Sequence, residues 1–587
     1  MRACIFALLL SARPVRVAAA SPPCDIYVAV SPASPGAVGT LQAAIDKAAT
    51  RIIATTICIA AGSYTCAELA GGGSNESSVT AALAPLSIRA APGGRVALDC
   101  EGGGRALAID GDDLDVTLMG IDVANGRAAN GGALAASGAR LSLTVLDCTF
   151  RHCVATCTVE GRTYRNKTIY GLGYYLGASS LDNGVGAEHR TSGCGAPSDA
   201  LGWVPQQLHA PAMPVVGGGG AISVRGGAVA EPSALAIVRT NFSNANSAGY
   251  GGAVLAIDVA SIDIERCAFV NATAPFIGGG VAVLNGAGAG ANASASTVPG
   301  GALRVINSTF ADIAGGGAGG GGVGGLLQGE RVIAARWSVR GSSFVRCSGG
   351  AGNALAGGGG GVGLVATARG EISHIALDVH SSHFAECTGG SNNIVAGGGG
   401  GVGVAAYAFE GPVVNVTAAL RAASSVDSCV GGKANLIASG AGGVGVAVVN
   451  GGADGANVSS SALVVSGARV RGCEGAEHSF YVAGAGGIGI GVISMWGGVD
   501  LTVLDVDSAD VSDCTGGMRS SLGAAGGVGA AVQSPNGDVV RTRFSVRSSA
   551  IARCVGGKHN WGGHSFEKSP EMVPMYGGAG GIALIVR

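Results

Sequence analysis

One stretch of the sequence shows the unit from which much of the chain is built: FAECTGGSNNIVAGGGGGVGVAAYA, from Phe384 to Ala408. It contains a hydrophobic anchor, a cysteine three residues later, a run of glycines, and an apolar segment that begins at Val402. The same order of features recurs along the chain towards residue 587. An internal repeat is therefore the dominant signal in the sequence.

The cysteine of this unit recurs at a nearly constant interval. Six cysteines each follow a hydrophobic anchor at an offset of three, and they are spaced by 40, 42, 44, 41 and 40 residues. The anchor and cysteine pairs are Phe344/Cys347, Phe384/Cys387, Val426/Cys429, Val470/Cys473, Val511/Cys514 and Ile551/Cys554. The apolar segment begins 15, 15, 15, 15, 14 and 28 residues after the successive cysteines. Because a flexible linker would not keep its length, we expect the glycine segment to be packed.

Weaker copies of the unit precede residue 344. Their anchors are Phe150, Phe242, Phe269 and Phe310. Paired glycines precede apolar segments at 131–132, 219–220, 251–252 and 300–301. We expect these segments to extend the same repeat.

The apolar segments have the composition of strands. Runs such as 362–366 and 375–379 are rich in Val, Ile, Leu and Ala and lie between glycines and serines. One unit of about 40 residues cannot bury its own apolar face, but stacked units can. The sequence therefore predicts an all-β fold, a parallel β-helix solenoid with three short strands in each coil.

Three stretches near residue 40 resemble the entry to a known kind of coil. They read VGTLQAAIDKA at 38–48, ICIAAGSY at 57–64 and LSIR at 86–89. Together they resemble the start of pectin lyase-like right-handed β-helices, in which a short helix caps the coil and a strand ends in a Pro-Gly-Thr-Tyr-like turn. Ala61-Gly-Ser-Tyr64 stands in place of that turn. The positions expected on the capping face of the helix are Leu41, Ala44, Ile45 and Ala48.

A second resemblance lies in the repeats. Gly219-Gly-Ala-Ile222 is similar to the Gly-Gly-Ala-Ile motif of polymorphic outer-membrane-protein repeats. Phe242-Ser-Asn-Ala245 resembles their Phe-x-x-Asn motif with the asparagine shifted by one, and Phe-x-x-Cys replaces it downstream. The two resemblances imply a right-handed parallel β-helix with a short N-terminal capping helix, and they leave the activity open.

The composition excludes several other classes of protein. Glycine accounts for 107 of 587 residues but without a Gly-X-Y period, so a collagen helix is excluded. The hydrophobic share of 47% and the charged share of 13% do not match intrinsic disorder. A net charge of −2 gives no electrostatic case for binding nucleic acid.

The N-terminus and the glycosylation signals predict export. Residues 1–20 combine a basic start, an apolar run and small residues, which is the pattern of a signal peptide. No later stretch is predicted to span a membrane. Eight Asn-X-Ser/Thr sequons predict N-glycosylation at Asn75, Asn166, Asn241, Asn271, Asn292, Asn307, Asn415 and Asn457. We expect an extracellular or cell-surface location.

The predicted organisation has four parts. A signal peptide at 1–20 is followed by the cap and first coils at 21–130. Residues 131–216 form an early coil with a long insertion at 156–216, and 217–587 form the glycine-rich repeats.

The cysteines fall into two predicted groups. Equivalent residues of adjacent coils lie about 4.8 Å apart and project side by side, a poor geometry for a disulfide. The six repeat cysteines are therefore expected to be free and buried. Local disulfides are predicted between Cys58 and Cys66 and between Cys157 and Cys194.

Candidate functional residues are few. The insertion holds five aromatic residues that could stack on sugar rings: Tyr164, Tyr170, Tyr174, Tyr175 and Trp203. An acidic stretch, Asp110, Asp112, Asp113, Asp115 and Asp122, could bind Ca²⁺ or act in acid–base chemistry, but a solvated turn is the simpler interpretation. His374, His380 and His383 flank Asp378 within one repeat and are expected to be ordinary surface residues.

These observations favour a structural, adhesive or carbohydrate-binding β-helix module with no catalytic residues, metal or cofactor assigned. The expected partners are extracellular polysaccharide or cell-surface glycans. The alternative is an extracellular polysaccharide lyase or hydrolase of the pectin lyase-like type.

Overall fold

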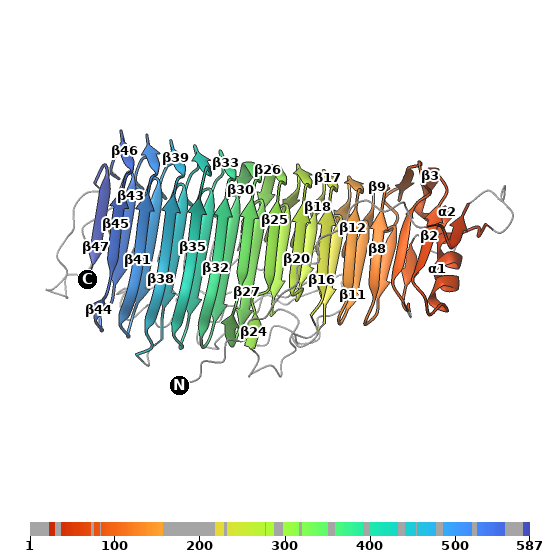
Figure 1. Ribbon diagram of the computed structural model, residues 1–587, viewed down its shortest axis with the longest axis horizontal. Helices are drawn as coiled ribbons and strands as arrows, with labels where there is room; N and C mark the ends of the chain where they lie inside the picture. The colour runs from red at the N-terminus through yellow and green to blue at the C-terminus, as the bar shows by residue number, and fades with distance from the viewer. Residues whose placement is uncertain are drawn as a thin grey trace, which may run out of the picture.

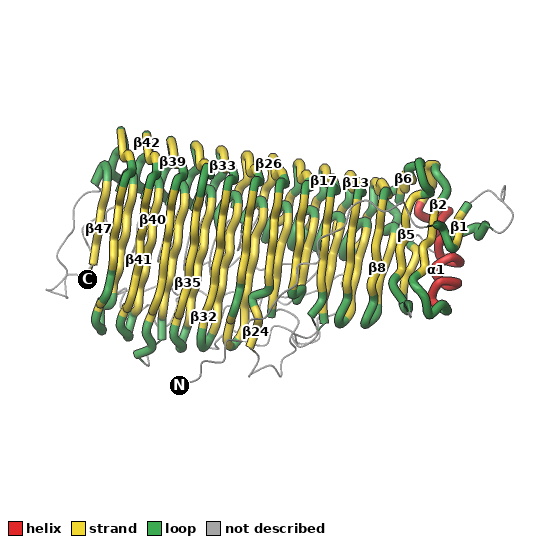
Figure 2. The backbone as a smooth tube through the Cα atoms, in the orientation of Figure 1, coloured by secondary structure: helices red, strands yellow, loops and turns green. Residues whose placement is uncertain are grey.

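A computed structural model shows the chain as a long stack of parallel strands that runs from a helical cap to the last coil (Figure 1). It describes residues 23–586 except for 30–36, 72–75, 83, 157–217, 228–231, 276, 287–296, 316–319, 350–357, 391–398, 433–440, 453–454, 477–484, 519–524 and 558–578. The strands lie side by side across the long axis of the molecule (Figure 2). The protein is therefore an all-β parallel β-helix solenoid, as the sequence predicts.

Each full coil contributes a strand to each of three parallel sheets. Sheet I consists of β4 (Ser77–Val79), β7 (Leu107–Asp110), β11 (Leu134–Gly138), β15 (Ile222–Gly226), β19 (Val254–Ile257), β23 (Val281–Asn285), β27 (Val323–Gly329), β31 (Val362–Ala368), β34 (Val402–Ala408), β37 (Val444–Asn450), β40 (Ile488–Ser494), β43 (Val528–Gln533) and β47 (Ile582–Val586).

Sheet II follows sheet I in each coil. It consists of β1 (Ile26–Val28), β2 (Thr55–Ile59), β5 (Leu86–Ala90), β8 (Asp115–Met119), β12 (Ser142–Leu146), β16 (Ala234–Val238), β20 (Ser261–Glu265), β24 (Thr297–Pro299), β25 (Ala302–Ile306), β28 (Arg331–Ile333), β29 (Arg336–Arg340), β32 (Ile372–His380), β35 (Val413–Arg421), β38 (Val458–Ser466), β41 (Val499–Asp507), β44 (Val539–Val540) and β45 (Arg543–Arg547).

Sheet III completes the coil with short strands. It consists of β3 (Gly62–Thr65), β6 (Val96–Asp99), β9 (Ile121–Ala124), β10 (Arg127–Ala128), β13 (Thr149–Arg151), β14 (Val154–Ala155), β17 (Asn241–Ser243), β18 (Asn246–Ser247), β21 (Ala268–Val270), β22 (Thr273–Ala274), β26 (Thr309–Gly315), β30 (Ser343–Ser348), β33 (His383–Ala385), β36 (Ser425–Asp427), β39 (Arg469–Arg471), β42 (Asp510–Ser512) and β46 (Ala550–Ala552).

The strand register explains the repeat in the sequence. Val362 of β31 pairs with Val402 of β34, and Phe344 of β30 pairs with Phe384 of β33. Equivalent positions of successive units therefore stack directly on one another. Residues that alternate along each strand point into the core, where they form continuous apolar columns.

The predicted capping helix is confirmed. α1 (Leu41–Ala49) begins after Thr40, whose Oγ1 accepts a hydrogen bond from the Ala43 N–H at 3.2 Å. This contact satisfies one of the free N–H groups at the start of the helix. The buried residues are those expected from the sequence, Leu41, Ala44, Ile45 and Ala48. A second helix, α2 (Cys66–Ala70), carries a full capping box between Thr65 and Glu68.

The anchor positions form a stack of aromatic rings. Phe150, Phe242, Phe269, Phe310, Phe344 and Phe384 lie in consecutive coils. Neighbouring rings are nearly parallel, with centroids 4.6 to 5.2 Å apart. Valine and isoleucine continue the column from Val426 to Ile551. The column is buried along most of its length and fixes the lateral register of the coils.

The glycines before sheet I lie where a side chain has no room. A Cβ on Gly400 would lie 2.1 Å from the carbonyl oxygen of Gly442 in the next coil. A Cβ on Gly361 would lie 2.5 Å from Cδ1 of Phe384. These close approaches leave no room for a side chain. They explain why glycine occupies the described end of the segment at a fixed place in the sequence relative to the anchor and the cysteine.

One predicted pair of glycines belongs elsewhere. Gly300 and Gly301 precede β25, which lies in sheet II, so they are not the fourth copy of the pairs before sheet I. Gly278 and Gly279 precede β23 at the same offset and take that place. The error arose because a glycine pair before an apolar run also occurs at the corner between sheets I and II.

The repeat cysteines are free, as predicted. Cys347, Cys387, Cys429, Cys473 and Cys514 are buried, and Cys554 is half-buried. The thiols contact main-chain oxygens, as in Cys387, whose Sγ lies 3.5 Å from the carbonyl oxygen of Phe344. Burial also raises the pKa of the core thiols Cys148 and Cys153, to about 12 and about 11.

The predicted disulfide between Cys58 and Cys66 is wrong. Cys58 pairs with Cys24, and Cys66 pairs with Cys100, each across 34 residues. The prediction joined cysteines that are close in sequence, whereas stacking brings together residues about one coil apart. Thr65 pairs with Asp99, so Cys66 and Cys100 follow in register. A disulfide can thus join adjacent coils at the junction of β3 and α2. The geometric argument made against disulfides between strands does not hold at this junction.

Within the described chain, no helix is long and apolar enough to span a membrane.

Candidate interaction surface

Several predicted site residues lie outside the described part of the chain. These are the aromatic residues of the insertion, Tyr164, Tyr170, Tyr174, Tyr175 and Trp203, together with Cys157, Cys194, Asn75, Asn166 and Asn292. Their roles stay predictions.

The other predicted glycosylation sites are accessible. Asn241, Asn271, Asn307 and Asn457 are exposed, and Asn415 is half-buried. Asn271 Nδ2 donates a hydrogen bond to Asn244 Oδ1 at 2.6 Å, so this amide also links two coils. Accessibility is a requirement for glycosylation, and modification itself stays a prediction.

The acidic stretch connects adjacent coils. Asp110 Oδ1 accepts a hydrogen bond from Ser137 Oγ at 2.7 Å, and Asp112 Oδ1 accepts one from the Ala139 N–H at 2.7 Å. Asp113 forms a two-pronged ion pair with Arg140, whose hydrogen bonds lower the pKa of the carboxyl. These carboxylates therefore have cross-coil partners, which supports the structural interpretation of the stretch.

The histidine group does not form a catalytic triad. His383 Nδ1 lies 2.6 Å from Ser425 Oγ and 3.6 Å from Asp427 Oδ2. A triad needs the hydroxyl and the carboxylate on different ring nitrogens, whereas both face Nδ1 here. His380 Nδ1 contacts Ser381 Oγ at 2.8 Å, and Asp378 pairs with Arg421. His380, His383 and Asp378 thus contact different partners and do not converge on one site.

The described residues contain no group of three or more His, Cys, Asp or Glu side chains that could hold a metal ion.

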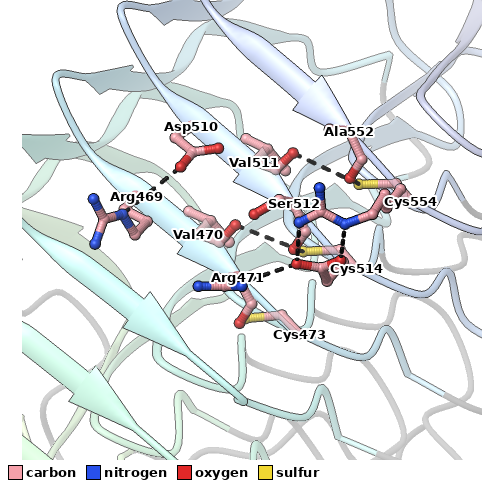
Figure 3. A network of polar contacts seen from close by, with 12 residues as sticks. Arg469, Val470, Arg471, Cys473, Asp510, Val511, Ser512, Cys514, Ala552 and Cys554 are labelled. Atoms are coloured by element: carbon pink, nitrogen blue, oxygen red, sulfur yellow. Dashed lines mark hydrogen bonds and ion pairs between the residues drawn. The ribbon is translucent and has the colours of Figure 1, made fainter.

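Ion pairs between coils line the outer face of sheet III near the last coils. Asp513 accepts from Arg471 on one side, at 3.3 Å, and from Arg553 on the other, at 2.5 Å. Arg469 lies 3.7 Å from Asp510 across the same pair of strands (Figure 3). Hydrogen bonds from Arg553 and Arg471 lower the pKa of Asp513. One carboxylate thus joins three successive coils.

The charges behind these ion pairs are segregated by coil. We define the acidic coil as 499–515 and the basic coil as 539–555, which pair strand for strand in sheets II and III. The acidic coil carries no Lys or Arg, and its carboxylates are Asp500, Asp505, Asp507, Asp510 and Asp513. The basic coil carries no Asp or Glu, and its cations are Arg541, Arg543, Arg547 and Arg553. The segregation is not apparent when the units are aligned by their apolar residues alone.

An aromatic corner is a second feature that the sequence analysis missed. The rings of Tyr407 and Phe409 meet edge to face with centroids 4.5 Å apart. Met495 packs on the same outer cluster, and Trp496 beside it is 41% exposed. These residues follow or end β34 and β40, at the turn from sheet I to sheet II. The sequence does contain aromatic residues at equivalent turns of two repeats, and that pattern could have identified the corner.

Comparison with known proteins identifies no family for this chain. No protein-family model matches the chain, and no curated protein matches it. One solved structure that it resembles is the mannuronan C-5 epimerase AlgE6 A-module of Azotobacter vinelandii, at 10% identity and a TM-score of 0.20, over 86% of this chain and 94% of that one. A TM-score of 0.20 is too low for this likeness to support an inference about fold or function. The chain's own strand pairing, three parallel sheets with matching positions stacked coil on coil, places it among the parallel β-helix proteins.

Proposed function

We propose that the protein is a secreted or cell-surface β-helix that serves as a structural or adhesive module and binds carbohydrate. The observation that carries this proposal is that outward-facing charged side chains bond to the neighbouring coils. Asp112, Asp113 and Asp513 bond to neighbouring coils, so they hold the stack together. Side chains held in this way form a stable surface and are poorly placed to move protons.

Two features support an extracellular location. The disulfides Cys24–Cys58 and Cys66–Cys100 hold the first coils, and disulfides persist in oxidising compartments. The described sequons are accessible to glycosylation. Both agree with the signal peptide that the sequence predicts.

Trp496 is our candidate contact for a sugar ring. Trp496 is 41% exposed, and the apolar face of an indole suits contact with a pyranose ring. At the equivalent corner two coils away, the half-buried Phe409 packs on the buried ring of Tyr407.

The test is a panel of uronate-containing and neutral polysaccharides, assayed for both binding and cleavage. We expect retention of at least one polysaccharide without new chain ends. The variant Trp496→Ala should lose most of the binding, whereas Trp337→Phe, changed in the core, should retain it. Cleavage that disappears in Asp112→Asn/Asp113→Asn would establish the alternative, a pectin lyase-like enzyme.

A further inference from the structure

Asparagine followed by glycine recurs along this chain. In such a pair the asparagine side chain loses its amide readily, because glycine has no side chain to hinder attack by its main-chain nitrogen. Six pairs are present, and the structure describes five of them: Asn125-Gly126, Asn130-Gly131, Asn285-Gly286, Asn450-Gly451 and Asn536-Gly537. Their surroundings differ, so the fold decides which of them can react.

Solvent reaches one of the five described pairs completely. Both residues of Asn536-Gly537 are exposed. Each of the other four described pairs has a buried member, which is Gly126, Gly131, Asn285 or Asn450. The reaction needs a base at the glycine nitrogen and water at the asparagine side chain. Among the described pairs, Asn536-Gly537 therefore meets both needs without any opening of the fold.

The main-chain N–H of Gly537 is also held loosely. It lies in the turn Ser534-Pro-Asn-Gly537 between β43 and β44, and it donates to the carbonyl oxygen of Ser534 at 3.4 Å. That distance is beyond the usual range for an N–H···O bond. By contrast, the Gly451 N–H donates to the carbonyl oxygen of Ala408 in the preceding coil at 2.9 Å. The nitrogen of Gly451 would have to break this bond before it could turn towards the side chain of Asn450.

The side chain of Asn536 connects its turn to the preceding coil. Its Nδ2 donates a hydrogen bond to the carbonyl oxygen of Met495 at 2.8 Å. Met495 packs on the outer apolar cluster, and Trp496 follows it in the chain. A carboxylate at position 536 could not donate to that oxygen and would repel it. Loss of the amide would therefore remove this contact from the turn that carries Trp496.

We propose that Asn536 is a site of spontaneous deamidation, and that the change breaks the contact with Met495. The nitrogen of Gly537 attacks Cγ of Asn536 and forms a C–N bond, and the side-chain amide leaves as ammonia with the proton taken from that nitrogen. The cyclic succinimide then adds water and opens to aspartate or isoaspartate. The net reaction consumes a water molecule and releases ammonia, with no oxidation or reduction. This chemistry does not depend on whether Trp496 contacts a sugar.

The test follows the full wild-type chain during incubation at mildly alkaline pH in water enriched in oxygen-18. A residue converted during the incubation takes up the heavy oxygen, which separates it from conversion during later digestion. Peptide mapping by mass spectrometry gives the rate at each pair. We expect Asn536 to convert at least about tenfold faster than Asn450, because the buried pair must first open locally. In guanidinium chloride, which unfolds the chain, the two rates should become similar.

Equal rates at Asn536 and Asn450 in the folded chain would overturn the proposed site. Absence of conversion at Asn536 in the folded chain, when the unfolded chain reacts, would overturn it as well.

The variant Asn536→Asp tests the loss of the contact with Met495. It should speed hydrogen exchange in residues 495–498 and leave β32 unchanged. Asn271→Asp, which changes an exposed amide in a distant coil, is the matched control and should leave residues 495–498 as in the wild type. Unchanged exchange in residues 495–498 of Asn536→Asp would show that the contact does not hold this turn, against the proposal.

Discussion

The indole of Trp337 occupies the space that a side chain at position 325 would need. A Cβ on Gly325 would lie 2.2 Å from Cη2 of Trp337. In the next coil the matching positions are Leu364 and Leu377. The small Gly325 and the large Trp337 thus stand where the next coil has two leucines, and the cross-section of the core stays nearly constant.

This relationship predicts a compensating pair of substitutions. Gly325→Leu should destabilise the coil through a clash, and Trp337→Leu should cost about 2–4 kcal/mol through the cavity it leaves. The double variant copies the pair in the next coil and should recover much of the loss. Urea unfolding of the four proteins measures the coupling, and additive losses would show that the two residues act separately.

The glycines before sheet I should be sensitive to a single methyl group. Gly400→Ala would place a Cβ against the main chain of the next coil, so we expect a loss of about 1–3 kcal/mol. Gly39→Ala is the control, because no atom lies within 4 Å of its added Cβ. Thermal unfolding of the two variants should therefore differ clearly. If Gly400→Ala unfolded at the same temperature as the wild-type protein, the coils would have to be able to separate locally at this corner.

The repeat thiols should be protected from alkylation in the folded protein. Burial raises the pKa of Cys347 and Cys429, so the reactive thiolate is scarce and hard to reach. Cys554 is half-buried and should react first with iodoacetamide. Mass spectrometry before and after denaturation would locate the labels. Rapid labelling of Cys387 in the native protein would contradict the buried column.

The ion pairs of the acidic coil should make stability fall in acid. Hydrogen bonds from Arg541 and Arg553 lower the pKa of Asp500 and Asp513 in the folded state. Their contribution is therefore complete above the unfolded carboxyl pKa of about 4, and it is lost as the pH falls through the lower folded values. We expect the melting temperature to drop below about pH 4, less steeply at high salt.

Replacing those carboxylates tests the assignment. Asp500→Asn/Asp513→Asn should lower the melting temperature at pH 7 and flatten its dependence on pH in acid. Asp115→Asn, in a distant coil, is the matched control. An unchanged acid profile in the double variant would show that other carboxylates control the transition.

Reduction should loosen the first coils selectively. Each disulfide spans 34 residues, and a loop of that size contributes about 3–4 kcal/mol by limiting the unfolded chain. We expect Cys66→Ser/Cys100→Ser to speed hydrogen exchange in α2 and β6 and to leave β32 unchanged. Uniform exchange along the whole stack would contradict a local role.

The fold was predictable because every unit places apolar residues at the same positions. Phe344 and Phe384 mark equivalent strands in the sequence, and in the structure they stack as neighbours. The capping face of α1 was predictable for a similar reason, since helical spacing alone groups its buried residues.

Contacts between coils were harder to predict than contacts within them. The partner of Cys66 is decided by the length of one coil, and nothing near Cys66 in the sequence identifies Cys100. Asp113 looked like a metal ligand or a solvated turn residue until the next coil supplied Arg140. The role of a polar residue in a solenoid depends on its neighbour one turn away, which local patterns do not contain.

The columns at the anchor, the cysteine and the glycines also determine how such a protein can change in evolution. Each unit brings its own copy of the residues that contact the units on both sides, as Gly400, Phe384 and Cys387 do. A duplication or deletion of one whole unit would preserve every column and change only the length of the rod. A gain or loss of a few residues inside a strand would break all of them at once. The gene is therefore free to vary in steps of one coil, and the distance the molecule spans is the property on which such steps act.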